Sequence, residues 1–340
     1  MWKDLFDRVR TWMALACLVA ALSVVLAAGC ASNARRASPS FGITASTDPA
    51  VIERGRYLVL GPGHCAACHG DPSQEARRRA GAVVPLSGGK VFDLGLAGSL
   101  TAPNITGHSE DGIGALSDDI LVRSLRYGVS KDGRTLAPFM SLADVSDEDL
   151  RAIISYLRVQ PAVAGPVPEE RLNWIGSLGL RLMLEPQGPE VDPPACMPPA
   201  RTAEYGRYLA HTIANCVGCH TRRSHLTGKF VGAPFAGGME LMEAGLLFVT
   251  PNITPAPEGV LGSSELEFIA RFRLEGRGQS GSPMPWESYV RMTDDDLGAI
   301  YRYLRKLPLS ETPARLAEFR SDVYSCGVAD ATPNINLIGA

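Results

Sequence analysis

Beyond its first 29 residues, the sequence lacks any run of apolar residues long enough to span a membrane. A helical span needs ~20 consecutive apolar residues, and the later apolar stretches are shorter. The sequence also lacks a basic tract, since 33 Lys and Arg face 36 Asp and Glu for a formal net charge of −3. Nucleic-acid binding relies on clustered positive charge. We therefore expect a main body that does not cross a membrane and does not bind nucleic acid.

Cysteine and histidine are scarce, with 8 and 6 copies in 340 residues, yet one motif built from them occurs twice. Each copy has two cysteines separated by two residues and followed directly by a histidine. This is the attachment signature of a c-type haem, because the two thiols can bond the vinyl groups of one porphyrin while the adjacent imidazole reaches the iron. The copies predict two covalently bound haem c groups, held by Cys65, Cys68 and His69 and by Cys216, Cys219 and His220.

Two other kinds of site use a pair of cysteines at this spacing. A redox dithiol of the thioredoxin type needs a βαβ setting, which the pattern around these motifs does not indicate. A zinc site needs two further ligands nearby, and His64 is the only obvious spare one near the first motif. Haem attachment is the favoured interpretation.

The N-terminus has the pattern of a secretory signal. Lys3, Arg8 and Arg10 precede an apolar stretch over residues 11–29, which ends in Gly29 and Cys30. This ending is typical of a bacterial lipoprotein, with Cys30 as the lipid-bearing first mature residue and residues 30–47 as a tether. An uncleaved membrane anchor is the alternative. Both predict an exported protein on the periplasmic side of a bacterial membrane.

Two cysteines remain after haem, lipid and signal have taken the others. Because an exported chain meets an oxidising compartment, Cys196 and Cys326 are candidates for a disulfide. Two buried free thiols are the alternative.

Short motifs recur in the same order in both halves of the chain, which indicates an internal duplication of one haem domain. They lie at residues 55–58 and 206–209, 85–89 and 234–238, 103–106 and 251–254, 138–140 and 283–284, and 146–150 and 293–297. The predicted domains are residues 48–160 and 201–308, with a Pro-rich linker over 161–200 and a C-terminal tail over 309–340.

Apolar periodicity and capping residues predict that each half is a small helical unit, so the expected fold class is all-α. The expected helices cover residues 49–60, 117–127 and the stretch after Ser146 in the first half, and residues 202–213, 264–275 and 293–306 in the second. A further short apolar helix is expected within residues 172–184 of the linker. It would pack between the domains or dock another protein.

The second axial position of each iron is predicted to take a methionine. Met140 is the only methionine between the two motifs and before the linker, and Met284 occupies the matching loop of the second half. A thioether ligand raises the reduction potential and blocks substrate binding, as suits electron transfer. In the second half, the weaker competitors are Met239, Met242 and Met292. His108, His211 and His225 could also bind an iron, but none of these histidines recurs at matching positions of the repeat.

Together, these motifs resemble the cytochrome c subunits of bacterial membrane-bound alcohol, gluconate and sorbitol dehydrogenases. The resemblance covers roughly residues 48–308. It implies two tandem class I cytochrome c-like domains with His69 and Met140, and His220 and Met284, as axial pairs. It also implies a quinoprotein or flavoprotein electron donor, and quinone or an oxidase as acceptor. Those subunits usually carry three haem motifs and a C-terminal membrane helix, whereas two motifs and an N-terminal apolar segment are found here.

Three functions are compatible with two such haems. The first is an electron carrier between a redox-protein donor and acceptor, with no substrate chemistry of its own. The second is a dihaem enzyme, such as a peroxidase or a thiosulfate-oxidising cytochrome, and the third is a haem-based sensor. Because an enzyme or a sensor needs an open iron site and each half offers a methionine, the sequence favours the carrier.

Overall fold

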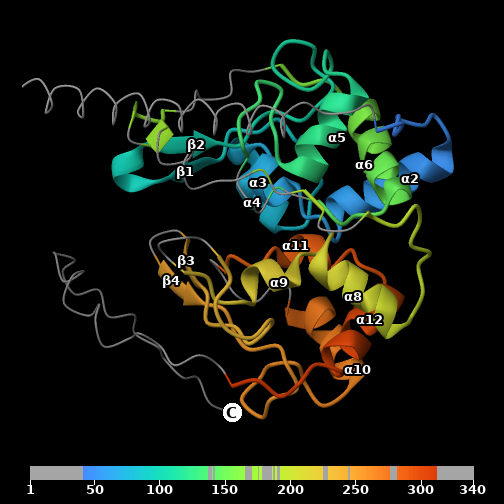
Figure 1. The fold of residues 1–340 in the computed structure, drawn as a ribbon, viewed down its shortest axis with the longest axis vertical. Helices are drawn as coiled ribbons and strands as arrows, with labels where there is room; N and C mark the ends of the chain where they lie inside the picture. Colours follow the sequence, from blue (N-terminus) through green and yellow to red (C-terminus); the bar gives the residue numbers. More distant parts are fainter. Residues whose placement is uncertain are drawn as a thin grey trace, which may run out of the picture.

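The computed structural model describes residues 41–136, 140, 142–164, 171–174, 176–177, 186, 188–189, 192–224, 229–243, 246–275 and 282–311. Figure 1 shows two lobes, coloured blue to green and yellow to red. We call residues 41–164 the first half and residues 192–311 the second half. Within the described residues, no helix has both the length and the apolar character needed to cross a membrane.

The two halves contain similar elements in the same order. The first half contains α2 (Pro49–Leu60), α3 (Ala66–His69), η1 (Pro72–Gln74), α4 (Glu75–Arg79), β1 (Val91–Asp93), η2 (Gly95–Ala97), β2 (Ser99–Thr101), α5 (Asp118–Tyr127) and α6 (Asp147–Val159). The second contains α8 (Ala203–His211), α9 (Cys216–Cys219), β3 (Glu240–Glu243), β4 (Leu246–Val249), α10 (Glu265–Ala270), the π-helical turn η4 (Arg271–Glu275), α11 (Trp286–Tyr289) and α12 (Asp294–Leu304).

A pair of long helices forms the frame of each half, α2 with α6 and α8 with α12. A Cβ atom on Gly55 would lie 1.8 Å from the carbonyl oxygen of Ala152, and one on Gly206 would lie 1.9 Å from that of Ala299. Only glycine allows so close an approach of two helix backbones. The repeated glycine therefore sets the helix spacing in both halves.

The predicted helices are confirmed, with small shifts at their ends. Ser146 and Thr293 cap the closing helices, because their hydroxyl oxygens accept the backbone N–H of Asp149 at 3.2 Å and of Asp296 at 3.1 Å. Acidic residues fill the first turn of both helices, where their negative charge interacts favourably with the positive end of the helix dipole. The helix expected over residues 264–275 ends earlier, as α10, and continues as the π turn η4.

The expectation of an all-α fold is wrong. Each half also contains a small antiparallel sheet of two strands, β1 with β2 and β3 with β4, and both hairpins lie on the same side in Figure 1. Strands of three or four residues are too short to produce a readable alternation of apolar and polar residues. Gly98, at φ 102°, closes the first hairpin, because its carbonyl oxygen accepts a hydrogen bond from the backbone N–H of Leu94 at 2.8 Å.

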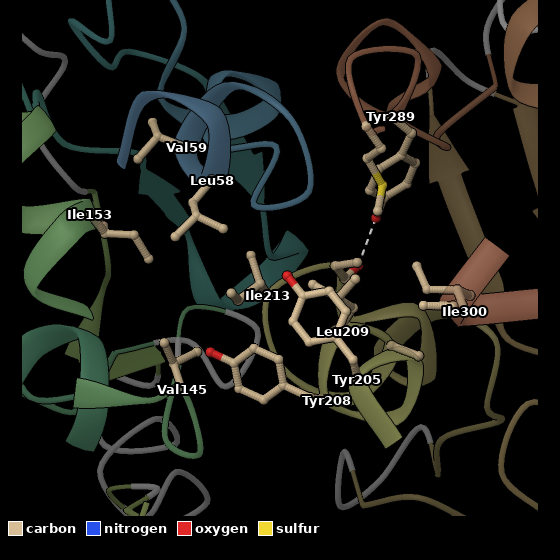
Figure 2. Packing of buried hydrophobic residues seen from close by; sticks show 14 of the residues in the cluster. Leu58, Val59, Val145, Ile153, Tyr205, Tyr208, Leu209, Ile213, Tyr289 and Ile300 are labelled. Atoms are coloured by element: carbon tan, nitrogen blue, oxygen red, sulfur yellow. Dashed lines mark hydrogen bonds between the residues drawn. The ribbon is translucent and has the colours of Figure 1, made fainter. Parts of the chain in front are cut away.

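One hydrophobic core runs through both halves. Its members include Leu58 and Leu150 from the first half and Leu209 and Leu297 from the second, none of them measurably exposed. Figure 2 shows Leu58 and Val145 of the first half facing the tyrosine side chains of α8. The domain boundaries drawn from the sequence stay a prediction.

Reciprocal hydrogen bonds join the halves. The Tyr57 hydroxyl donates to Asp296 Oδ2 at 2.5 Å, and the Tyr208 hydroxyl donates to Asp149 Oδ2 at 2.8 Å. These tyrosines occupy the same position of the repeated motif, and each reaches the start of the closing helix of the other half. Arg54 adds bonds to Asp149 at 2.8 and 3.1 Å and to the Tyr205 hydroxyl at 3.1 Å. The duplication has thus produced a nearly symmetric interface.

The linker and tail predictions fall largely outside the described residues. Of the apolar stretch 172–184, the structure describes only residues 172–174 and 176–177, and Trp174 is 75 % exposed. At the start of the tail, the Asn252 side chain donates to the carbonyl oxygen of Ser310 at 2.7 Å.

Candidate haem-attachment sites

Each Cys-x-x-Cys-His motif lies on a single short turn of helix, α3 in the first half and α9 in the second. The residue before the first cysteine adopts a left-handed backbone, with φ 39° at His64 and 46° at Asn215. On a helical turn, side chains three positions apart lie on the same face. The two thiols of each motif therefore face the same side, as attachment to one porphyrin requires.

The histidine of each motif is held in one tautomer by a backbone carbonyl. His69 Nδ1 lies 2.8 Å from the carbonyl oxygen of Pro103, and His220 Nδ1 lies 2.9 Å from that of Pro251. Because a carbonyl can only accept, each Nδ1 carries the proton, which leaves the Nε2 lone pair available. Metal-ligating histidines are commonly oriented by this kind of bond.

Burial lowers the pKa of His69 and of His220, although the bond to the proline carbonyl acts in the opposite direction. Both imidazoles are thereby favoured in the neutral form, which is the form that binds a metal. The His69 Nε2 atom is also buried and has no hydrogen-bond partner among the described residues. Such an atom is costly unless something else satisfies it.

The other repeated motifs hold these carbonyls in place. Asn104 Oδ1 accepts the backbone N–H of Thr106 at 2.9 Å and its hydroxyl at 2.8 Å, and the second half repeats both bonds at 2.8 Å, between Asn252 and Thr254. These turns fix the chain just after the proline whose carbonyl orients the histidine. Sequence reasoning noted the repeat but missed this role.

The repeated Gly-Gly motif also has a defined role. Gly88 N–H donates to the carbonyl of His69 at 2.8 Å, and Gly237 N–H does the same for His220 at 2.8 Å. Both glycines have positive φ, and a Cβ atom there would lie 2.4 or 2.5 Å from the proline carbonyl carbon. Only glycine fits at a point where the two backbones meet so closely.

The thiols complete the two sites. Burial raises the pKa of Cys65 and of Cys216 to about 12, so both are protonated in the free chain. In α11, the buried Trp286 Nε1–H has no partner among the described residues. Two thiols on one face and an available imidazole nitrogen fit a covalently attached porphyrin.

For the candidate methionines, the structure gives the burial and the packing of the side chains. Met140 and Met284 are both half-buried, and Met284 packs against the core. Of the competitors, Met292 is only 2 % exposed within the core, whereas Met242 is 64 % exposed on β3. Met239 is half-buried, and its backbone N–H donates to the hydroxyl of Thr250 at 3.0 Å. The assignment of Met140 and Met284 as ligands stays a prediction.

The competing histidines have other partners where the structure describes them. His211 Nε2 lies 2.7 Å from the Tyr303 hydroxyl, and His108 Nδ1 accepts the backbone N–H of Asp111 at 3.1 Å. His225 lies outside the described residues. In the described part of the chain, no group of three or more His, Cys, Asp and Glu side chains could hold a metal ion, so the zinc alternative finds no ligand set there.

The disulfide between Cys196 and Cys326 and the lipid on Cys30 stay predictions. Cys196 is exposed, and Cys326 and Cys30 lie outside the described residues, as does the rest of the N-terminal signal.

No protein-family model matches the chain. It is similar to the "Fructose dehydrogenase cytochrome subunit" of Gluconobacter japonicus, with 29 % identity over 87 % of this chain and 62 % of that protein. It is 30 % identical to the "Alcohol dehydrogenase (quinone), cytochrome c subunit" of Gluconacetobacter polyoxogenes, over 78 % of this chain and 58 % of the relative. The "Gluconate 2-dehydrogenase cytochrome c subunit" of Pantoea cypripedii is 40 % identical over 35 % of this chain and 28 % of its own length. The resemblance inferred from the motifs is confirmed, and the chain spans about three fifths of the length of the first two relatives.

Proposed function

Because the chain is similar over most of its length to cytochrome c subunits of bacterial dehydrogenases, we propose that it is a c-type cytochrome with two covalent haems. It passes electrons from a dehydrogenase of the periplasm or membrane to a downstream respiratory acceptor and has no substrate chemistry of its own. The observation that carries the proposal is the pair of Cys-x-x-Cys-His turns whose histidines each donate Nδ1–H to a repeated proline carbonyl.

Each half would hold its haem with the same set of four side chains, two cysteines, one histidine and one methionine. The thiols of Cys65 and Cys68, and of Cys216 and Cys219, bond the porphyrin, while His69 and His220 offer Nε2 to the iron. Met140 and Met284 supply the second axial sulfur. When bound, a haem with two protein ligands supplies reversible one-electron chemistry at its iron. The proline carbonyls orient the imidazoles. Because His69 and His220 are buried, solvent has little access to the nitrogen that would bind the iron.

The position of the protein in the cell follows from its N-terminus. We propose that the chain is exported and anchored to the periplasmic side of the membrane by lipid on Cys30. An anchored carrier stays close to a membrane dehydrogenase and to the respiratory chain. The donor and the acceptor are therefore redox proteins in or at that membrane.

A potentiometric titration followed by visible spectroscopy tests the proposal. A pyridine haemochrome assay should count two haems per chain, and the native protein should show two low-spin haems of relatively high potential that do not bind carbon monoxide. Met140→Ala and Met284→Ala should each open one iron, lower the potential of that haem and permit carbon monoxide binding. Met242→Ala is the matched control, because its side chain is 64 % exposed.

Two outcomes would contradict this proposal. A count below two haems would remove the dihaem assignment. A high-spin or carbon monoxide-reactive haem in the unmutated protein would favour a peroxidase, a thiosulfate-oxidising enzyme or a sensor.

A further inference from the structure

The segment between the candidate methionine and the cap of the closing helix is longer in the second half than in the first. Six positions separate Met140 from the cap Ser146 (146 − 140), whereas nine separate Met284 from the cap Thr293 (293 − 284). The longer segment forms α11. This longer segment is one of the places at which the two halves differ.

The longer segment contacts the first half beside its attachment motif. Glu287 forms a hydrogen-bonded ion pair with Arg78, and their side chains are only 10 % and 6 % exposed. Arg291 donates to the carbonyl oxygen of Gly81 at 2.6 Å. These bonds join α11 to α4 and to the residues that follow it. A buried ion pair of this kind can define one arrangement of two packed units.

The hydroxyl of Tyr289, at the end of α11, lies between the two attachment loops. It donates to the carbonyl oxygen of Ala214 at 2.7 Å, as Figure 2 shows by the dashed line at Tyr289. The hydroxyl oxygen of Tyr289 also lies 3.4 Å from His64 Nδ1. This nitrogen donates to the carbonyl oxygen of Pro62 at 2.9 Å and can share its proton with the Tyr289 hydroxyl. The His64 and Tyr289 rings meet edge to face, with centroids 5.4 Å apart.

Both partners of the Tyr289 hydroxyl lie close to an attachment cysteine in the sequence. His64 directly precedes Cys65, and Ala214 is separated from Cys216 only by Asn215. A continuous route of covalent and hydrogen bonds therefore runs from Cys65 through His64, the Tyr289 hydroxyl and Ala214 to Cys216. Tyr289 is 6 % exposed, so water does not compete for these bonds.

We propose that Tyr289 is a positioning residue that bridges the two attachment loops and sets the rate of electron exchange between the two haems. The inference rests on the proposed function, because it requires a haem in each half. The step moves one electron from the reduced haem to the oxidised haem of the same chain, so it needs no further oxidant or reductant. Tyr289 neither gains nor loses the electron; its hydroxyl holds the two loops together and connects them.

The experiment uses full-length holoprotein with three single substitutions. Tyr289→Phe removes the bridging hydroxyl and keeps the ring. His64→Asn changes the other end of the bridge to the residue that the second half has at the equivalent left-handed position, Asn215. Tyr303→Phe is the matched control, because it removes a hydroxyl bonded to His211 at 2.7 Å within the second half alone.

Flash photoreduction with a ruthenium tris-bipyridine reagent, at less than one electron per chain, measures how fast the electron redistributes between the haems. The absorbance and potential of each haem come from the titration described above. Tyr289→Phe and His64→Asn should slow the redistribution severalfold, while haem count and low-spin spectra stay as in the parent. Tyr303→Phe should leave the rate unchanged.

An unchanged rate in Tyr289→Phe protein with two intact haems would overturn the bridge and leave the proposed function in place. Equal slowing in the Tyr303→Phe control would overturn it too, because general loosening of the second half would then explain the effect. If Tyr289→Phe protein fails to retain both haems, His64→Asn decides between the same outcomes. A parent protein with fewer than two haems would instead remove the proposed function.

Discussion

The reciprocal tyrosines of the interface should differ in their contribution to stability, although they occupy equivalent positions of the repeat. Tyr57 donates to Asp296 at 2.5 Å and accepts the backbone N–H of Thr293 at 3.2 Å. Tyr208 makes the corresponding bonds to Asp149, at 2.8 Å, and from the N–H of Ser146, at 3.2 Å. The difference lies in what remains at each carboxylate when the hydroxyl is removed.

Asp149 would keep a strong partner and Asp296 would not. Arg54 binds Asp149 through two hydrogen bonds, and no arginine has an equivalent bond to Asp296 in the described part of the chain. Both carboxylates are 4 % exposed. A hydrogen bond to a charged group contributes ~1.5–3 kcal/mol, and a buried group that loses its partner costs up to about the same. We therefore expect Tyr57→Phe to lower the free energy of unfolding by ~2–3 kcal/mol and Tyr208→Phe by ~1 kcal/mol.

Urea unfolding of both variants, followed by far-UV circular dichroism, measures the difference as a shift of midpoint at constant slope. A double-mutant cycle that combines Tyr57→Phe with Asp296→Asn isolates the pair, since its coupling energy excludes the packing change common to both phenylalanines. Equal losses in the two variants, or a larger loss in Tyr208→Phe, would refute the argument that Arg54 makes the interface asymmetric.

Three further predictions address packing, pH and the anchor. Gly55→Ala should destabilise the protein by more than the ~1–3 kcal/mol typical of overpacking, because the added Cβ atom would lie 1.8 Å from a carbonyl oxygen of α6. Gly107→Ala is the control and should cost little, because its Cβ atom would lie 3.4 Å from the nearest neighbouring atom. Thermal unfolding compares the stability of the two variants. Burial raises the pKa of Asp296 above its usual value, so the folded chain binds this proton more tightly than the unfolded chain, and stability from this group rises as the pH falls through that window. Unfolding measured from the ordinary pKa of an aspartate upward should show that Asp296→Asn lacks this component, and identical pH profiles would disprove it. Cys30→Ala should abolish lipidation, and mass spectrometry of the mature N-terminus would contradict the anchor if it found an unmodified start at another residue.

Local features of this protein could be predicted from the sequence because their causes are local. Each attachment motif is defined within five consecutive residues, and each closing helix by a hydroxyl cap followed by acidic residues. The duplication was visible because short motifs recur in the same order, even though it did not reveal that the carbonyls of Pro103 and Pro251 orient the histidines.

Only the tertiary structure decided how the two halves meet. The hairpins were missed because each strand is shorter than the pattern needed to recognise it, and their pairing depends on turns at glycines such as Gly98. The reciprocal bonds of Tyr57 and Tyr208 join residues more than 50 positions apart, so no local pattern predicts them. The bridge at Tyr289 exists because α11 of the second half packs against the first half. Contacts of this kind depend on how complete surfaces fit together, whereas motif spacing and helix caps depend on a few neighbouring residues.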